Sequence, residues 1–335
     1  MISMQSRFRG ALYGVLVGDC FGAPFEGMNV NPTTLAEQIE DLLNSTRGPL
    51  RFTDDTAMTI ATCKSLIQNR GLDPRHLAKE YSETYFSEPK RGYGAAVRQV
   101  FCSLRDTNYQ DPYGPASNQF YGKGSFGNGA AMRCNGIALF AHKNNLNESQ
   151  ALDLVENCSR ITHSHIYGIH GAVLLVAAIR YVLSRDEESF NDNDFLDYLI
   201  RSMSELEDSD DHIFSDKLKT VKRVLDQLSI TGEDVTQREI VSLLGNDVSA
   251  QNSVPLAIYS FLRGISKFTD SYRLENEFVR TLHWAISCGG DTDTIASMAC
   301  GLSGAYLGQN KVPENLYKKC ESWEEMRNLA DQLAS

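Results

Sequence analysis

Residues 288–308 read "CGGDTDTIASMACGLSGAYLG" and combine the two features that decide the fold. Small residues recur through the second half, as in a helix that packs closely against another helix. The first half places Asp291, Thr292, Asp293 and Thr294 where that helix would begin. One short acidic residue is enough to cap a helix, because its oxygen accepts a hydrogen bond from an unpaired backbone N–H. Four oxygen-bearing side chains exceed what a cap requires.

A second stretch repeats this arrangement. In "RFTDDTAMTIATCKSL", residues 51–66, Thr53, Asp54, Asp55 and Thr56 precede another helical run. Helix capping explains each cluster taken alone. Two clusters in one chain could instead converge on a cation, and their oxygens suit Mg²⁺, Mn²⁺ or Ca²⁺ better than zinc. The sequence therefore predicts two helix N-termini that share a cation site.

Helical spacing of apolar residues dominates the chain, and strict two-residue alternation is nearly absent. The 335 residues are 42% hydrophobic and 22% charged, which is enough for a substantial core. Candidate ligands lie on both sides of the polar stretch 184–195, so this stretch does not mark a domain boundary. We predict an all-α protein, with residues 1–335 forming one compact bundle of helices that cross at steep angles.

Composition also restricts location and partners. The formal net charge of −11 argues against direct DNA binding, although helix N-termini and metal ions could still hold an anionic substrate. No signal peptide and no segment of membrane-spanning length is evident. The eight cysteines form no C-x-x-C pair and indicate a reducing compartment. We expect an intracellular protein, and two arginines near the start leave mitochondrial targeting open.

A glycine-rich loop occupies the start of "QFYGKGSFGNGAAMRCNGIALF", residues 119–140. Gly122, Gly124 and Gly127 satisfy the G-x-G-x-x-G pattern of dinucleotide-binding folds. That match is weak, because no apolar strand precedes it and no alternation of strands and helices surrounds it. A glycine-rich loop before a helix can still present backbone N–H groups to a phosphate.

Other side chains of the same stretch could add contacts to such a ligand. Ser125 offers a hydroxyl, and Phe120 and Phe126 could stack on an aromatic base. The alternative is an ordinary helix start with two core phenylalanines.

Three of the seven histidines lie in "RITHSHIYGIHG", residues 160–171. His163, His165 and His170 could be zinc ligands, but no acid or cysteine lies near them in sequence. We favour His163 as a polar contact to substrate.

One acidic residue, Glu26, follows the Gly/Pro-rich turn in "GDCFGAPFEG", residues 18–27. It is either an exposed loop residue or a catalytic acid or base on a mobile loop.

Five motifs together resemble the ADP-ribosylglycohydrolase family. They are "GALYGVLVGDCFGAPFEG", "FTDDTAM", "GSFGNGAAMR", "THSHIYGIHGA" and "GGDTDTIASMACGLSGAYLG". The glycine loop and "SVPLAIYSFLRG" are most similar to the type 3 branch of that family. The resemblance implies a compact all-α fold with a binuclear magnesium centre.

The resemblance also implies roles for individual residues. The metal ligands would be Thr53, Asp54, Asp55, Asp291, Asp293 and Thr294. The catalytic acid/base would be Glu26. The substrate contacts would be Phe120, Gly124, Ser125, Phe126, Gly127, Asn128 and His163. Position 126 is often tyrosine in this branch, whereas this chain has phenylalanine there, so a hydroxyl contact from this position is absent.

The activity that the resemblance implies is hydrolysis of the O-glycosidic bond at the anomeric carbon of ADP-ribose. The expected substrates are serine-modified proteins, poly(ADP-ribose) and O-acetyl-ADP-ribose, and the expected cofactor is two Mg²⁺ ions, with Mn²⁺ as an alternative. We expect a monomer in the cytoplasm and nucleus that binds no membrane. Two alternatives stay open: hydrolysis of arginine-linked ADP-ribose, and a non-catalytic ADP-ribose-binding protein.

Overall fold

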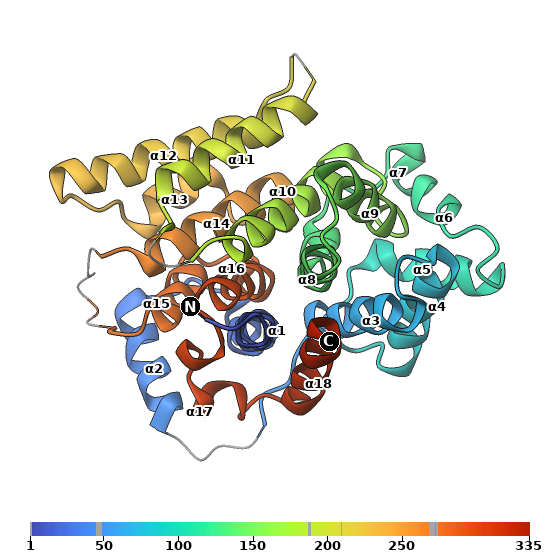
Figure 1. The fold of residues 1–335 in the computed structure, drawn as a ribbon, viewed down its shortest axis with the longest axis horizontal. Coiled ribbons are helices and arrows are strands. Elements are labelled where there is room, and N and C mark those ends of the chain that lie inside the picture. Colours follow the sequence, from blue (N-terminus) through green and yellow to red (C-terminus); the bar gives the residue numbers. More distant parts are fainter. Residues whose placement is uncertain (1, 45–48, 187–188, 209, 268–271, 273) are drawn as a thin grey trace.

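The computed structural model describes residues 2–44, 49–186, 189–208, 210–267, 272 and 274–335. Within these ranges the regular structure is helical, without a β-strand, and two isolated β-bridges join Leu50 to Cys320 and Gly127 to Ser249. The all-α prediction is therefore confirmed. Figure 1 shows the arrangement of the helices. The α-helices are α1 (Met4–Gly22), α2 (Pro32–Asn44), α3 (Asp54–Asn69), α4 (Pro74–Ser87), α5 (Ala95–Asp106), α6 (Gly114–Ser117), α7 (Gln119–Gly122), α8 (Asn135–Lys143), α9 (Glu148–Arg160), α10 (Ile166–Leu183), α11 (Asp192–Leu206), α12 (Ile213–Thr231), α13 (Gln237–Leu244), α14 (Ala250–Ile265), α15 (Glu277–Ser287), α16 (Thr292–Leu307), α17 (Glu314–Tyr317) and α18 (Trp323–Ala334).

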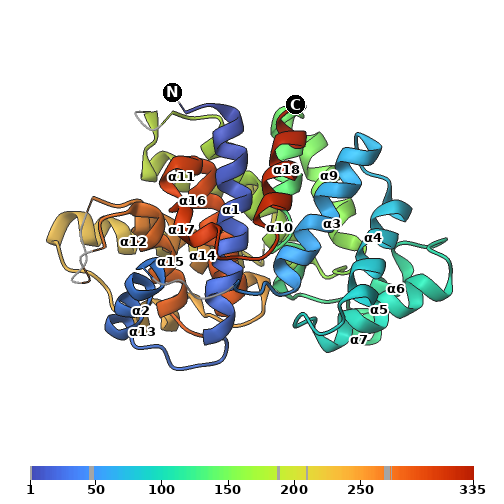
Figure 2. The same cartoon turned by 90° about the horizontal axis from the view of Figure 1, so that it is seen from below.

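The centre of the molecule is the pair α1 and α16, which lie side by side (Figures 1 and 2). Glycines at every fourth position of α1 face α16, so the two backbones touch. A Cβ built on Gly14 would lie 2.0 Å from the carbonyl oxygen of Cys300, and one on Gly18 would lie 2.2 Å from that of Ala296. Only glycine fits at these positions. The small residues of α16 therefore have the packing role that the sequence predicts.

The close packing of α1 and α16 fixes the position of the acidic end of α16. The hydroxyl of Thr292 donates to the carbonyl of Gly22, the last residue of α1, at 2.9 Å. The backbone N–H of Gly27 donates to the carbonyl of Gly290, also at 2.9 Å. The loop that carries Glu26 is thus attached on both sides to the start of α16.

Helix α10 corrects one expectation from the sequence. Its 18 residues, Ile166–Leu183, are long and apolar enough to cross a membrane, whereas no such segment was predicted. In the fold, 72% of this window is buried. The helix packs against α8, α9, α14 and α16, which accounts for its apolar sequence.

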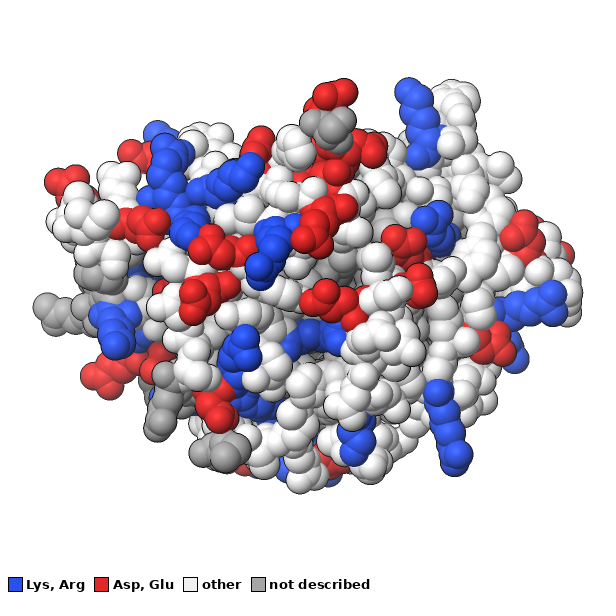
Figure 3. Space-filling view, turned by 45° about the horizontal axis from the view of Figure 1, so that its top comes forward, with Lys and Arg blue, Asp and Glu red and all other residues white. Residues whose placement is uncertain are grey.

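Charged side chains of both signs are mixed on one face of the molecule (Figure 3). Figure 3 shows acidic and basic residues interspersed over the visible face, without a broad field of basic side chains. All eight cysteines are free thiols, and seven of them are buried. Cys102 is the exposed one.

Candidate active site

Most of the predicted site residues surround one cavity of about 310 Å³. The predicted residues among its lining are Glu26, Asp54, Asp55, Ser125, Gly127, Asn128, His163, Asp291, Asp293 and Thr294. They come from the loop after α1, the starts of α3 and α16, the glycine loop before α8 and the turn before α10. Tertiary packing therefore brings together segments that lie far apart in the sequence. The hydrogen bond from Thr292 to Gly22, for example, spans 270 residues.

The start of α3 is held by a buried acid that the sequence reasoning did not single out. Asp19, on α1, is 0% exposed. Its carboxylate accepts from the backbone N–H of Thr53 at 2.9 Å and of Thr56 at 3.0 Å. The same two threonines also donate their hydroxyls to it, at 2.8 and 2.6 Å. Asp19 thus shares the capping of α3 with Thr53, whose hydroxyl accepts from the backbone N–H of Asp55, and leaves the carboxylates of Asp54 and Asp55 available for a ligand.

The start of α16 is held differently. Asp291 occupies the N-cap position but makes no capping hydrogen bond with its side chain. Instead, its Oδ2 accepts from Nδ2 of Asn128 at 2.5 Å, and its backbone N–H donates to the carbonyl of Asn246 at 2.9 Å. Capping therefore does not account for the carboxylate of Asp291.

The two helix starts meet in a direct contact. Thr294 Oγ1 donates to Oδ2 of Asp55 at 3.2 Å, across 239 residues of sequence. The other carboxylate oxygen of Asp55, Oδ1, is buried and has no hydrogen-bond partner among the described residues. A buried carboxylate oxygen without a partner is costly unless a cation or water satisfies it.

The carboxyl groups at this junction favour their protonated forms when no cation is present. Burial is the main cause for each of the three aspartates, and neighbouring aspartates add to it. It raises the pKa of Asp54 to about 8, and it raises the pKa values of Asp55 and Asp291 well above the ordinary range. Burial also raises the pKa of Asp19 to about 6, against the effect of its hydrogen bonds from Thr56 and Thr53.

The acids fit a hard divalent cation. One carboxylate oxygen each from Glu26, Asp291 and Asp293 lies within 4.8 Å of the others. Asp55 adds the unpartnered Oδ1, and carboxylate oxygens are the ligands that Mg²⁺, Mn²⁺ and Ca²⁺ prefer. A cation within reach of Asp55 Oδ1 would satisfy that buried oxygen, and its positive charge would lower the raised pKa values.

Glu26 lies at the mouth of the cavity. Its side chain is exposed, unlike those of Asp291 and Asp293. The negative charge of Asp293 raises its pKa, and partial burial adds to this effect. A glutamate with a raised pKa next to solvent can hold a proton closer to neutral pH than an isolated glutamate can.

The glycine loop is fixed by a segment that the sequence reasoning missed. The backbone of Asn128 donates to the carbonyl of Val248 at 2.9 Å, and Ala250 donates to the carbonyl of Phe126 at 3.0 Å. Asn246, in the same segment, accepts from the backbone of Asp291. Residues 246–250 therefore connect the glycine loop to the start of α16, and no local motif in them predicts this.

Three predicted substrate contacts lie outside the cavity lining. Phe120 and Phe126 are 53% and 50% exposed, so neither is a core phenylalanine. Phe120 has a left-handed backbone with φ 51°, and the ring of Phe126 packs edge-on against His165. Gly124 has φ +73°, and a Cβ there would lie 2.2 Å from Ser164 Oγ. Thr53 also lies outside the lining, because its side chain faces Asp19.

The three histidines of the 160–171 stretch lie in three different surroundings. His163 lines the cavity, whereas His165 caps α10 by accepting from the backbone of Tyr167 at 3.1 Å. His170 is buried and faces Phe214. Across the described part of the chain, these three form no group with metal-ligand spacing, so the zinc alternative has no structural support.

Several polar residues of the cavity were not among the predicted site residues. Arg133 and Thr162 are buried beside His163. Gln119 also lines the cavity, and within the described ranges neither polar atom of its amide has a hydrogen-bond partner. Arg133 ends the motif "GSFGNGAAMR", and Thr162 begins the motif "THSHIYGIHGA". A search for polar residues within these motifs could therefore have identified both.

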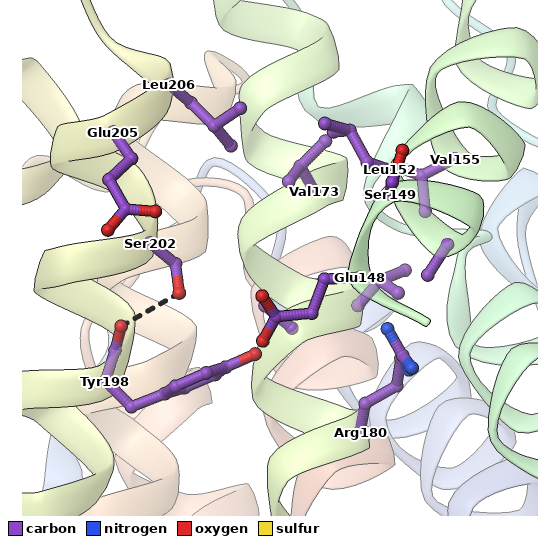
Figure 4. Close-up of a pocket in the computed structure, with 13 residues that line it drawn as sticks. Glu148, Ser149, Leu152, Val155, Val173, Arg180, Tyr198, Ser202, Glu205 and Leu206 are labelled. Atoms are coloured by element: carbon purple, nitrogen blue, oxygen red, sulfur yellow. Dashed lines mark hydrogen bonds between the residues drawn. The ribbon is translucent and has the colours of Figure 1, made fainter. Parts of the chain in front are cut away.

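A second cavity, of about 270 Å³, lies between α9, α10 and α11 and shares no lining residue with the first (Figure 4). Leu152, Val155 and Val173 contribute to an apolar lining. Glu148 and the hydroxyl of Tyr198 point toward one another, and burial and this glutamate raise the pKa of Tyr198. This second cavity holds no cluster of three acids among the described residues, so the first cavity is the candidate active site.

Comparison with known proteins identifies the family of the chain. The family model described as ADP-ribosylglycohydrolase matches residues 2–335. The protein "ADP-ribosylhydrolase ARH3" of Mus musculus is 38% identical over 98% of this chain and 91% of its own length. The human protein of the same name is 37% identical, over 98% and 93%. These relatives are ADP-ribosyl glycohydrolases.

A solved structure shows the same fold. It is described as an "ADP-ribosylglycohydrolase-related protein complex" and superposes with a TM-score of 0.63 at 22% identity, covering 99% of this chain and 98% of its own. The family resemblance drawn from the five motifs is confirmed by the family model and by the relatives. The chain belongs to the ADP-ribosylglycohydrolase family.

Proposed function

We propose that this chain is a divalent-metal-dependent hydrolase that releases ADP-ribose from O-linked substrates. The observation that carries the proposal is the junction of α3 and α16. There, Thr294 donates to Asp55, whose second carboxylate oxygen has no partner among the described residues. The similarity to proteins named ADP-ribosylhydrolase ARH3 supports ADP-ribose as the substrate. The bond cleaved would be the glycosidic bond at the anomeric carbon.

The residues that would hold the cofactor are those at the two helix starts. They are Thr53, Asp54, Asp55, Asp291, Asp293 and Thr294, and we propose two Mg²⁺ ions, with Mn²⁺ as an alternative. A divalent cation bound by these groups would supply Lewis acidity toward the oxygens of the ribose. Thr53 also donates to Asp19, so it would contribute its remaining lone pair.

Glu26 would move the proton. Its raised pKa allows it to protonate the departing oxygen or to accept a proton from the attacking water, as carboxyl groups do in glycoside cleavage. Its exposed position on the loop after α1 gives it access to a substrate that enters the cavity.

The remaining lining would bind the rest of the ADP-ribose. The loop with Ser125, Gly127 and Asn128 lines the cavity, and the hydroxyl of Ser125 would donate to the pyrophosphate or the adjoining ribose. Phe120 and Phe126 stand exposed beside this loop, where an adenine ring could stack on them. The proposed substrates are serine-linked ADP-ribose, poly(ADP-ribose) and O-acetyl-ADP-ribose. An intracellular location stays a prediction.

A comparison of linkages tests the proposal. Release of ADP-ribose is measured in parallel from peptides modified at serine and at arginine, in Mg²⁺ and in excess chelator. We expect faster release from serine and no release in chelator. Faster release from arginine would replace the proposal with the arginine-specific activity.

The variant Glu26→Gln separates an enzyme from a binding protein. General acid–base catalysis contributes about 10²–10⁴-fold, so turnover should fall by roughly that factor while calorimetric affinity for ADP-ribose changes little. Glu37→Gln, at an exposed position of α2, is the control and should leave both unchanged. Tight binding without turnover in the unsubstituted protein would show a non-catalytic ADP-ribose-binding protein.

A further inference from the structure

His163 stands in the cavity wall with its two ring nitrogens in different surroundings. The residue is 7% exposed, and its Nδ1 lies 2.7 Å from Oγ1 of Thr162. Nε2 makes no hydrogen bond to any described residue. A Cβ on Gly129 would lie 2.9 Å from Nε2, and one on Gly127 would lie 3.5 Å from it. The two glycines therefore leave room for the Nε2 edge of the ring beside the loop.

The hydroxyl of Thr162 is fixed from its other side by Arg133. Nη2 of Arg133 donates to Thr162 Oγ1 at 2.5 Å, and Nη1 donates to the carbonyl of Gly129 at 2.8 Å. The guanidinium also lies over the ring of Tyr81, 4.4 Å from its centroid. Arginine cannot accept a hydrogen bond, so the direction of the Arg133–Thr162 bond is unambiguous.

The hydroxyl hydrogen of Thr162 then has one acceptor. Thr162 is 0% exposed, and its only other side-chain contact among the described residues is Nδ1 of His163. If Nδ1 carried the proton, the hydroxyl hydrogen would be buried without an acceptor, which costs about 1–3 kcal/mol. Thr162 therefore donates to Nδ1, and the hydrogen of the neutral ring is on Nε2.

We propose that Arg133 and Thr162 are positioning residues that hold His163 as a neutral ring whose Nε2–H donates to an acceptor oxygen of the bound ligand. Such an acceptor is a phosphate or hydroxyl oxygen. The reversed tautomer would present a bare nitrogen lone pair, which repels a phosphate oxygen and could only accept from a hydroxyl. The identity of the ligand rests on the proposed function, whereas the tautomer does not.

The surroundings also keep the ring uncharged. Burial lowers the pKa of His163 to about 3, and the nearby Arg133 guanidinium acts in the same direction. Arg133 is 2% exposed and has no ion-pair partner in the part of the chain that the structure describes. Its charge would therefore also favour an anionic group in the cavity.

The test has two independent readouts. Two-dimensional ¹H–¹⁵N spectra of protein with labelled histidine identify the protonated ring nitrogen, without any ligand. Calorimetry then measures the affinity for ADP-ribose. We expect the Nε2–H pattern for His163, and we expect Thr162→Val to lose that pattern and to bind ADP-ribose roughly three- to tenfold more weakly, the effect of one hydrogen bond.

Two further variants control for a merely structural effect. Thr162→Ser keeps the hydroxyl and should restore both the pattern and the affinity. Thr281→Val removes another fully buried threonine hydroxyl, one that bonds to Glu277 and Ser303 between α15 and α16, and it should change neither readout.

Three outcomes would overturn the inference. One is an Nδ1–H pattern or a charged ring in the unsubstituted protein at neutral pH. Another is an Nε2–H pattern that survives Thr162→Val. The third is a changed tautomer with unchanged affinity, which would remove Nε2–H from ligand binding. No binding of ADP-ribose to the unsubstituted protein, with the expected tautomer present, would instead refute the proposed function and leave the positioning of His163 intact.

Discussion

The starts of α3 and α16 offer the same residue types to one cavity, but different partners hold them in place. At α3, Thr53 is the cap residue and Asp19 of another helix accepts from the backbone of Thr53 and Thr56, so Asp54 and Asp55 have no capping role. At α16, Asp291 is itself at the cap position but bonds to Asn128. In both cases the acids are freed from the capping role that their sequence position suggests. Two similar stretches of sequence therefore bring their acids to one cavity through different hydrogen-bond partners.

The largest effect is expected when the support of α3 is removed. Asp19→Asn replaces one carboxylate oxygen with a donor and keeps the other, so the donors of either Thr53 or Thr56 lose their acceptor. We expect the free energy of unfolding of the metal-free protein to fall by about 3 kcal/mol, measured by urea denaturation.

The control is Asp331→Asn. This half-buried acid pairs with Arg9 at 2.7 Å, so its loss should cost less than about 1 kcal/mol. Equal losses at the two positions would mean that Asp19 does not support α3 in the way we describe.

A smaller change, a gain in the free energy of unfolding, is expected when Mg²⁺ is added to chelator-treated protein. A ligand that binds only the folded state stabilises it by about 2.7 kcal/mol at 100 times its dissociation constant. If the two helix starts share the site, Asp55→Asn and Asp293→Asn should each lower this gain, and the measurement is urea denaturation with and without Mg²⁺. An undiminished gain in either variant would assign the cation to one helix start alone.

The support of α16 should contribute less than that of α3. Asn128→Ala removes the donor to Asp291 and to Ser253, which lies 3.1 Å from Nδ2. We expect a loss of about 1–2 kcal/mol in the metal-free protein. Asn144→Ala, at an exposed position after α8, should cost much less. A loss larger than that of Asp19→Asn would reverse the comparison.

The smallest effect on the free energy of unfolding is expected from a change of pH in the metal-free protein. Burial raises the folded-state pKa of Asp54 to about 8, so between about pH 4 and pH 8 the folded state binds more protons than the unfolded state. Stability should therefore decrease as pH rises through this window. The effect is limited because Asp54 is only half-buried and the solvent screens part of its charge.

Asp54→Asn removes this contribution, so its stability should depend less on pH than that of the unsubstituted protein. Saturating Mg²⁺ should flatten the curve of the unsubstituted protein in the same way. Urea denaturation at several pH values between about 5 and 8 provides the comparison. Parallel curves for the variant and the unsubstituted protein, both without metal, would contradict the raised pKa.

The sequence predicted those parts of the site that depend on local pattern. The Thr53–Thr56 and Asp291–Thr294 clusters stand out because four oxygen-bearing side chains begin a helix, and all but Thr53 and the buried Thr56 and Thr292 line the cavity. Asp19 did not stand out, because one acid between glycine and cysteine in an apolar helix has no local signature. Its partners lie 34 and 37 residues away, so only the packing of α1 against α3 reveals them.

Local spacing by itself determined the helical class and the close packing of small residues, because periodicity and side-chain size act over one or two turns of helix. Only the tertiary structure decided which oxygens stay free for a ligand. The bond from Asn128 to Asp291 spans 163 residues, and the bond from Thr294 to Asp55 spans 239. The hydrogen-bond partners of a buried polar group depend on which distant segments pack beside it, and no local pattern encodes that.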